Sequence, residues 1–138
     1  MTRLTWRSLW GPFLAAPGVV NTILVAEDDA NVRTLLTRIL RRCGYTVELA
    51  EDGGEAITRL EEKNYDALVL DLMMPRVSGV EVINYMIETR PLMVQKTVVV
   101  TAFPGTASRE ELNAVCQVVP KPFDIKVLLA AIEECVAA

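Results

Sequence analysis

The sequence predicts an α/β fold, a doubly wound five-stranded parallel sheet with helices on both faces. From residue 22 onward, short continuous apolar runs alternate with longer segments of helical periodicity. Continuous apolar runs are typical of strands that are buried on both faces. Right-handed crossovers between such strands distribute the helices over the two faces of the sheet. A chain of 138 residues is long enough for one domain with a substantial core.

Three of the expected strands lie in the first half of the chain. Apolar runs predict them at 23–26, 45–49 and 67–70. The first helix has apolar residues at helical spacing between the first two runs, and Gly44 ends it. Asp52 is expected to cap the second helix.

The second half of the chain continues the alternation. A third helix is expected from residue 80 and ends before Pro91, because the residue before a proline disfavours helical backbone. A β-branched strand over 97–100, a short helix around 108–114 and a strand over 115–119 follow. Asp124 is expected to cap the last helix.

Composition excludes several classes of function. With 51% hydrophobic and 23% charged residues the chain is globular, and its net charge of −4 provides no basic field for direct binding of nucleic acid. No apolar run is long enough to span a membrane. The chain has no histidine, which excludes Ser-His and Cys-His catalysis and His-ligated metal sites.

The termini and the cysteines bear on organisation and compartment. Residues 1–20 are interpreted as an N-terminal extension, either disordered or preceding the natural start, and residues 21–138 as the folded domain. Cys43, Cys116 and Cys135 are odd in number and lack metal-ligand spacing. We interpret them as thiols of a reducing compartment, which predicts a cytoplasmic protein, with disulfides as the minor alternative.

Polar residues follow four of the apolar runs. Glu27 and Asp28 follow the first, Asp71 the third, Thr101 the fourth and Lys121 the fifth. In the sheet order 2-1-3-4-5 these four strands are neighbours, and their carboxyl ends bring the side chains to one crevice. Close carboxylates repel one another, and Mg²⁺ with oxygen ligands relieves that repulsion.

This combination suits phosphoryl transfer to a carboxylate. Asp71 is the expected nucleophile, Lys121 a point charge for a phosphoryl oxygen, and Thr101 a hydrogen-bond donor to another. By contrast, four arginines of the first helix are interpreted as a solvated face, with a docking face for a kinase as the alternative: Arg33, Arg38, Arg41 and Arg42.

Four fragments in order, ILVAEDD, YDALVLDLMMPRVSG, VVVTA and PKPFD, resemble the receiver domain of two-component response regulators, the CheY-like family with its flavodoxin-like fold. Each fragment alone is weak evidence, but four in order over residues 21–138 are specific. The resemblance implies that Asp71 is the phosphoacceptor, that Asp28 binds Mg²⁺ directly and that Glu27 does so largely through water. It also implies that Met73 supplies a backbone carbonyl to the metal.

The resemblance further implies that Thr101 is the switch hydroxyl and that Lys121 is the lysine of the motif, followed by a cis bond to Pro122. It predicts a single-domain response regulator that takes its phosphoryl group from a phosphohistidine of a sensor kinase or phosphotransfer protein. Such a domain would catalyse its own phosphorylation and dephosphorylation without being a turnover enzyme. It would signal through a downstream protein or pass the group along a phosphorelay.

Two departures from the family pattern keep alternatives open. Val118 stands where the family usually has Tyr or Phe, and the fourth helix is short, so that any switching is expected as an order change in residues 103–113. These departures motivate a degenerate receiver, an interaction module that acts without phosphorylation. A nucleotide- or flavin-binding domain of the same topology would instead need a Gly- or Ser/Thr-rich loop where the acids follow the first strand.

Overall fold

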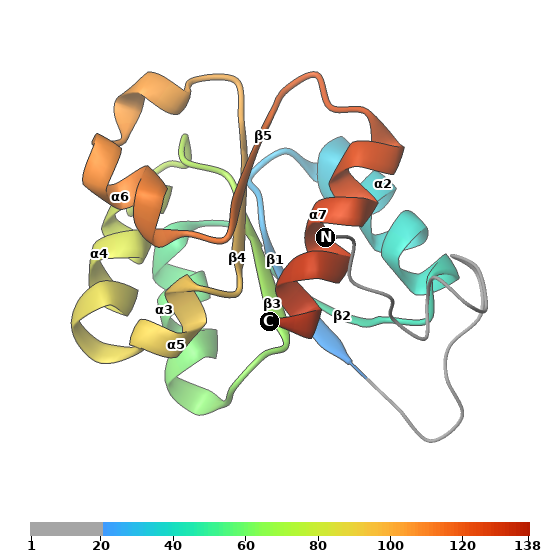
Figure 1. Cartoon of the computed structure of the whole chain (residues 1–138), viewed down its shortest axis with the longest axis horizontal. Coiled ribbons are helices and arrows are strands. Elements are labelled where there is room, and N and C mark those ends of the chain that lie inside the picture. The colour runs from blue at the N-terminus through green and yellow to red at the C-terminus, as the bar shows by residue number, and fades with distance from the viewer. Residues whose placement is uncertain (1–20) are drawn as a thin grey trace.

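Five parallel strands form the centre of the computed structural model, in the predicted order β2-β1-β3-β4-β5 (Figure 1). The structure describes residues 21–138, and the extension expected at 1–20 lies outside the described residues. The strands are β1 Thr22–Ala26, β2 Thr46–Ala50, β3 Ala67–Leu70, β4 Thr97–Thr101 and β5 Gln117–Pro120.

Helices cover both faces of the sheet, as predicted (Figure 1). One face carries α2 and α7, and the other carries α3, α4, α5 and α6. Their bounds are α2 Ala30–Arg42, α3 Gly53–Glu62, α4 Gly79–Thr89, α5 Pro91–Val94, α6 Arg109–Ala114 and α7 Ile125–Ala137, with a 3-10 turn, η1, over Pro104–Thr106.

The central strands show why their sequences are continuously apolar. In β1, Ile23 and Val25 pack toward α2 and α7, whereas Leu24 and Ala26 pack toward the opposite layer of helices. Successive side chains of a strand point to opposite faces, so a strand covered on both faces needs apolar residues at every position. The sheet therefore separates two apolar cores.

Polar side chains cap the helices at their first turns. The expected caps Asp52 and Asp124 accept hydrogen bonds from backbone amides of α3 and α7. Ser78 and Ser108 begin α4 and α6 with reciprocal capping boxes that use Glu81 and Glu111. The six residues of α6 agree with the short fourth helix expected from the sequence.

Two features differ from expectation. A further short helix, α5, begins at Pro91, because proline fits the first helical position, where its missing N–H has no partner to lose. Cys116 and Cys135 form a disulfide, so the interpretation of these two residues as thiols was wrong. The reason is that α7 packs back along β5 and brings together cysteines that are 19 residues apart. Cys43 is a buried thiol, as expected.

Among the described residues, none of the helices combines the length and the apolar character that crossing a membrane requires.

Candidate functional site

The carboxyl ends of β1 and β3 bring the predicted acids together. Glu27 and Asp28 follow β1, Asp71 follows β3, and carboxylate oxygens of the three lie within 4.8 Å of one another. Glu27 and Asp71 are buried, whereas Asp28 is exposed. Such a set of oxygen donors is suited to a hard divalent cation.

Lys121 reaches this cluster from the loop after β5. Its Nζ donates to Asp71 Oδ2 at 2.9 Å and also forms an ion pair with Glu27 Oε1. The Lys121–Pro122 bond is cis, as expected. One ammonium group thus contacts two buried carboxylates, which otherwise would repel each other in a medium of low dielectric constant.

Burial and the close charges shift two pKa values. Burial, together with the neighbouring Asp71 carboxyl group, raises the pKa of Glu27 to about 7, although Lys121 opposes this shift. Burial disfavours the charge on Lys121, but its hydrogen bonds to Glu27 and Asp71 outweigh that effect and raise its pKa. Lys121 therefore keeps its positive charge at neutral pH.

The loop after β3 folds tightly against the backbone of Asp71. The Gly79 amide donates to the Leu72 carbonyl at 2.9 Å, and a Cβ atom on Gly79 would lie 2.2 Å from the Asp71 carbonyl oxygen. Only glycine allows this approach. At the start of the same loop, the Met73 amide donates to Asp71 Oδ1 at 3.1 Å, so both carboxylate oxygens of Asp71 are held.

Thr101 and Met73 lie beside this cluster in different ways. Thr101 is fully buried at the end of β4, and its Oγ1 accepts a hydrogen bond from the Phe103 amide at 3.2 Å. Within the described part of the chain, this hydroxyl bonds to that amide rather than to Asp71. The side chain of Met73 is half exposed, and the role predicted for its backbone carbonyl stays a prediction.

Sequence reasoning missed the contact of Arg33 with the acidic loop. Its Nη1 donates to the backbone carbonyls of Glu27 and Asp28, at 2.8 Å in each case, and only 14% of its side chain is exposed. Its interpretation as part of a solvated face was therefore wrong, whereas Arg38 and Arg41 are exposed as expected. The available signal was position: Arg33 lies in the first turn of its helix, one turn beyond the acids.

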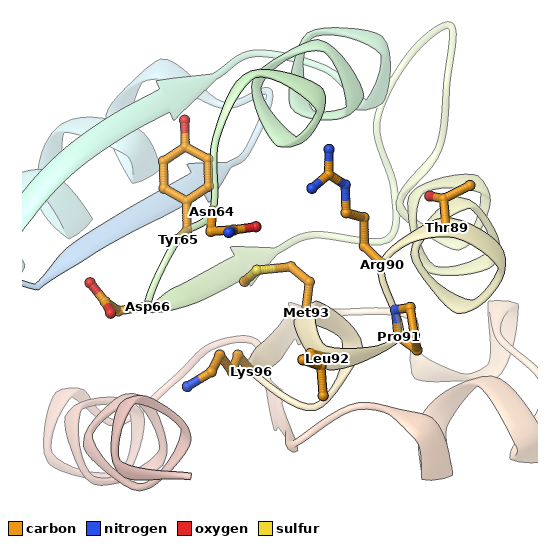
Figure 2. A pocket seen from close by; sticks show the side chains of 9 residues that line it. All are labelled: Asn64, Tyr65, Asp66, Thr89, Arg90, Pro91, Leu92, Met93 and Lys96. Carbon is orange, nitrogen blue, oxygen red and sulfur yellow. The ribbon is translucent and has the colours of Figure 1, made fainter.

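A hollow of about 500 Å³ lies at the amino ends of the strands, opposite the acidic cluster (Figure 2). Asp66 and Lys96, which precede β3 and β4, help to line it, whereas Asp71 follows the far end of β3. The hollow is thus separate from the acidic cluster. The other lining residues are Asn64, Tyr65, Thr89, Arg90, Pro91, Leu92 and Met93.

Comparison with known proteins identifies relatives that cover most of the described residues. The family model of the response regulator receiver domain matches residues 23–133. The response regulator MprA of Mycobacterium ulcerans (strain Agy99) is 44% identical over 110 residues, which are 78% of this chain and 47% of that protein. MprA of Mycobacterium avium (strain 104) is 43% identical over 110 residues, with the same coverage. The chain thus spans about half the length of the curated relatives it matches.

Solved structures of response regulators and receiver domains share this fold. The response regulator TrrA of Thermotoga maritima, in complex with Mg²⁺-BeF, has a TM-score of 0.76 and 31% identity, covering 83% of this chain and 98% of that one. TrrA in complex with the histidine kinase ThkA has a TM-score of 0.74 and 31% identity, covering 83% and 97%. A CheY-like receiver domain protein of Methanospirillum hungatei JF-1 has a TM-score of 0.76 and 29% identity, covering 86% and 95%.

Proposed function

Because this chain belongs to the family of response regulator receiver domains, we propose that it accepts a phosphoryl group on Asp71 with Mg²⁺. One observation carries the proposal: the carboxylates of Glu27, Asp28 and Asp71 converge within 4.8 Å, and Lys121 contacts two of them. A mere helix cap or solvated turn would need neither buried carboxylates nor a cation from another loop.

The donor set fits Mg²⁺, which prefers oxygen ligands and retains several waters. We expect Asp28 and Asp71 to bind it directly, Glu27 largely through water, and Met73 through its backbone carbonyl. Bound Mg²⁺ would supply positive charge close to the oxygens of the transferred group.

The residues of this chain then divide the chemistry of transfer. A carboxylate oxygen of Asp71 attacks phosphorus while the phosphorus–nitrogen bond of a phosphohistidine breaks, so the group passes to Asp71 as an acyl phosphate. Lys121, whose Nζ already donates a hydrogen bond to the Asp71 carboxylate, stabilises a phosphoryl oxygen. Thr101 accepts a hydrogen bond from the Phe103 amide, so its own hydroxyl proton remains available to another phosphoryl oxygen.

The family resemblance implies a sensor histidine kinase or a histidine phosphotransfer protein as the partner, and residues 1–138 contain no histidine that could serve as the donor. The complex of TrrA with the histidine kinase ThkA supports this class of partner. The domain would act as a self-phosphorylating and self-dephosphorylating switch for a downstream protein, not as a turnover enzyme. Action as a single-domain regulator stays a prediction, since the curated relatives are about twice as long.

Cytoplasmic localisation is likewise a prediction. Two-component signalling from a sensor kinase supports it, whereas the Cys116–Cys135 disulfide argues against it, because disulfides are rare in the reducing cytosol.

Intact mass after incubation with acetyl phosphate and Mg²⁺ tests the proposal. We expect one added phosphoryl group on the wild type, and none on Asp71→Asn or in the presence of a chelator. Asp66→Asn is a matched control at the other end of β3 and should react like the wild type. Addition to Asp71→Asn would contradict Asp71 as the acceptor.

The alternative is a degenerate receiver that acts by protein contact without phosphorylation. The 37% exposure of Val118 and the six-residue α6 favour it, because neither matches the usual switch. Absence of both phosphoryl addition and Mg²⁺ binding in the wild type would select this alternative.

A further inference from the structure

Arg33 occupies an unusual position on α2. It lies in the first turn, and its amide donates to the carbonyl of the cap residue Asp29 at 2.9 Å. Its side chain turns back over the loop between β1 and α2, where only 14% of it is exposed. Arg38, further along the same helix, is exposed. Burial of a guanidinium group needs hydrogen-bond partners to offset the lost hydration.

Those partners are the backbone of the acidic pair. Arg33 Nη1 donates to the carbonyl oxygens of Glu27 and Asp28, each at 2.8 Å. Nη2 lies 3.4 Å from Glu51 Oε1, on the loop after β2. Arg33 therefore holds the carbonyl groups of the same two residues whose carboxylates face the proposed metal.

The peptide between Glu27 and Asp28 transmits this contact to a side chain. Its carbonyl accepts from Arg33, and its N–H, on Asp28, donates to Glu27 Oε2 at 3.0 Å. A trans peptide is planar, with its C=O and N–H pointing in opposite directions. Fixing the carbonyl thus fixes the N–H that orients the Glu27 carboxylate, whose other oxygen contacts Lys121.

We propose that Arg33 is a positioning residue for the Mg²⁺ site, because its guanidinium fixes the Glu27–Asp28 peptide and through it the direction of the Glu27 carboxylate. This inference rests on the proposed function, in that it assumes a Mg²⁺ site at the acidic cluster. Arg33 itself binds neither the metal nor the phosphoryl group.

Charge and positioning predict opposite effects when Arg33 is replaced. Removing a cation near the site strengthens Mg²⁺ binding if charge alone matters, because like charges repel. Loss of positioning weakens it, since partners that orient metal ligands are typically worth roughly 10- to 100-fold in metal affinity. The sign of the change in affinity therefore separates the two.

Calorimetric titration with MgCl₂ tests the inference at a temperature where circular dichroism shows every variant folded. For Arg33→Met we expect a Kd raised by roughly tenfold. For Arg33→Lys, which keeps the charge but is shorter and lacks the planar fork, we expect a smaller increase of roughly threefold. Arg38→Met, which removes the same charge from the exposed face of α2, should leave the Kd unchanged or slightly lower.

Each result is decisive. A wild type that binds Mg²⁺, with Arg33→Met binding as tightly or more tightly, overturns the inference and leaves the proposed function standing. Urea unfolding of Arg33→Met provides a second readout. If the substitution lowers the urea midpoint but leaves the Kd for Mg²⁺ unchanged, Arg33 contributes to stability only and the inference is overturned. A wild type that does not bind Mg²⁺ overturns both. If Arg33→Met does not fold, Arg33→Lys decides, because its charge is kept and an unchanged Kd excludes positioning.

Discussion

Different interactions stabilise the carboxyl edge of the sheet and its β5 side. The carboxyl edge consists of Glu27, Asp28, Asp71 and Lys121, and its contacts join charged groups from three loops. The β5 side consists of α6, β5 and α7, where apolar side chains of β5 pack against α7 and a disulfide links Cys116, just before β5, to Cys135 of α7. On this side Val118, which is partly exposed, stands where the family usually has Tyr or Phe.

This difference indicates how the two tasks of a receiver are divided. The proposed acceptance of a phosphoryl group needs a few groups held at fixed positions, and the residues proposed for it, Asp71 and Lys121, lie at the carboxyl edge. Read-out of that event needs a surface that changes, and on the β5 side a disulfide ties Cys116, the residue before β5, to Cys135 of α7. We therefore expect phosphoryl transfer and read-out to respond to different substitutions.

The largest effect is expected at Lys121. Lys121→Met removes the cation that would stabilise a phosphoryl oxygen, so the rate of phosphoryl addition from acetyl phosphate should fall by roughly 100- to 1000-fold. Mg²⁺ affinity should rise or stay equal, because a positive charge next to Glu27 and Asp71 is lost. Lys126→Met, on the exposed start of α7, is the control and should react like the wild type. An unchanged rate in Lys121→Met would contradict the role given to the lysine.

The second effect concerns the disulfide of the β5 side. Reduction should lower the free energy of unfolding by about 3 kcal/mol, as expected for release of a closed loop of this length. Urea unfolding with and without dithiothreitol measures it, and the Cys116→Ser/Cys135→Ala double variant should not respond to the reductant. The phosphoryl addition rate should not change. A reductant that alters this rate would show that the two regions are not separate.

The third effect is the pH dependence of the carboxyl edge. Burial raises the pKa of Glu27 from its ordinary 4.5 to about 7, so the folded state binds this proton more tightly than the unfolded chain. The resulting stabilisation is complete below about pH 4.5 and is lost as the pH rises through about 7. Metal-free protein should thus lose about 2 kcal/mol of unfolding free energy between about pH 5 and pH 8. Parallel pH curves for the wild type and Glu27→Gln would contradict this.

The smallest effect is expected at Val118. Val118→Ala removes a partly exposed side chain and should change the free energy of unfolding by less than about 0.5 kcal/mol, without altering phosphoryl addition. Val119→Ala is the matched control: it lies next along β5, is 3% exposed and should cost about 2 kcal/mol. Loss of phosphoryl addition in Val118→Ala would place Val118 in the machinery of the site.

Local rules predicted most of the fold and the convergence of the acids. The apolar run at 67–70 predicted β3 with the bounds that the structure shows. The rule that functional groups gather at the carboxyl ends of strands predicted that Glu27, Asp71 and Lys121 lie together. These features depend on patterns a few residues long. The bounds of β5 were less accurate, since Val115 and Cys116 precede the strand instead of beginning it.

The remaining features depend on geometry that no short pattern records. Pro91 ends one helix and also begins the next, and the sequence shows only the ending. The contact of Arg33 with the acidic loop requires its side chain to fold back along α2, and the disulfide requires α7 to lie against β5. Both follow from tertiary packing, so the separate segments did not predict them.

Amide spectra of ¹⁵N-labelled protein, recorded with and without Mg²⁺ and beryllofluoride as a phosphoryl mimic, show directly whether the carboxyl edge is a Mg²⁺-dependent phosphoryl site. We expect shifts at Asp28, Asp71 and Lys121, together with a change in residues 103–113, while the resonances of residues around Cys135 keep their positions. Unchanged resonances at the carboxyl edge would contradict a Mg²⁺-dependent phosphoryl site. Large shifts confined to Val118 and α7 would contradict the separation of the two regions.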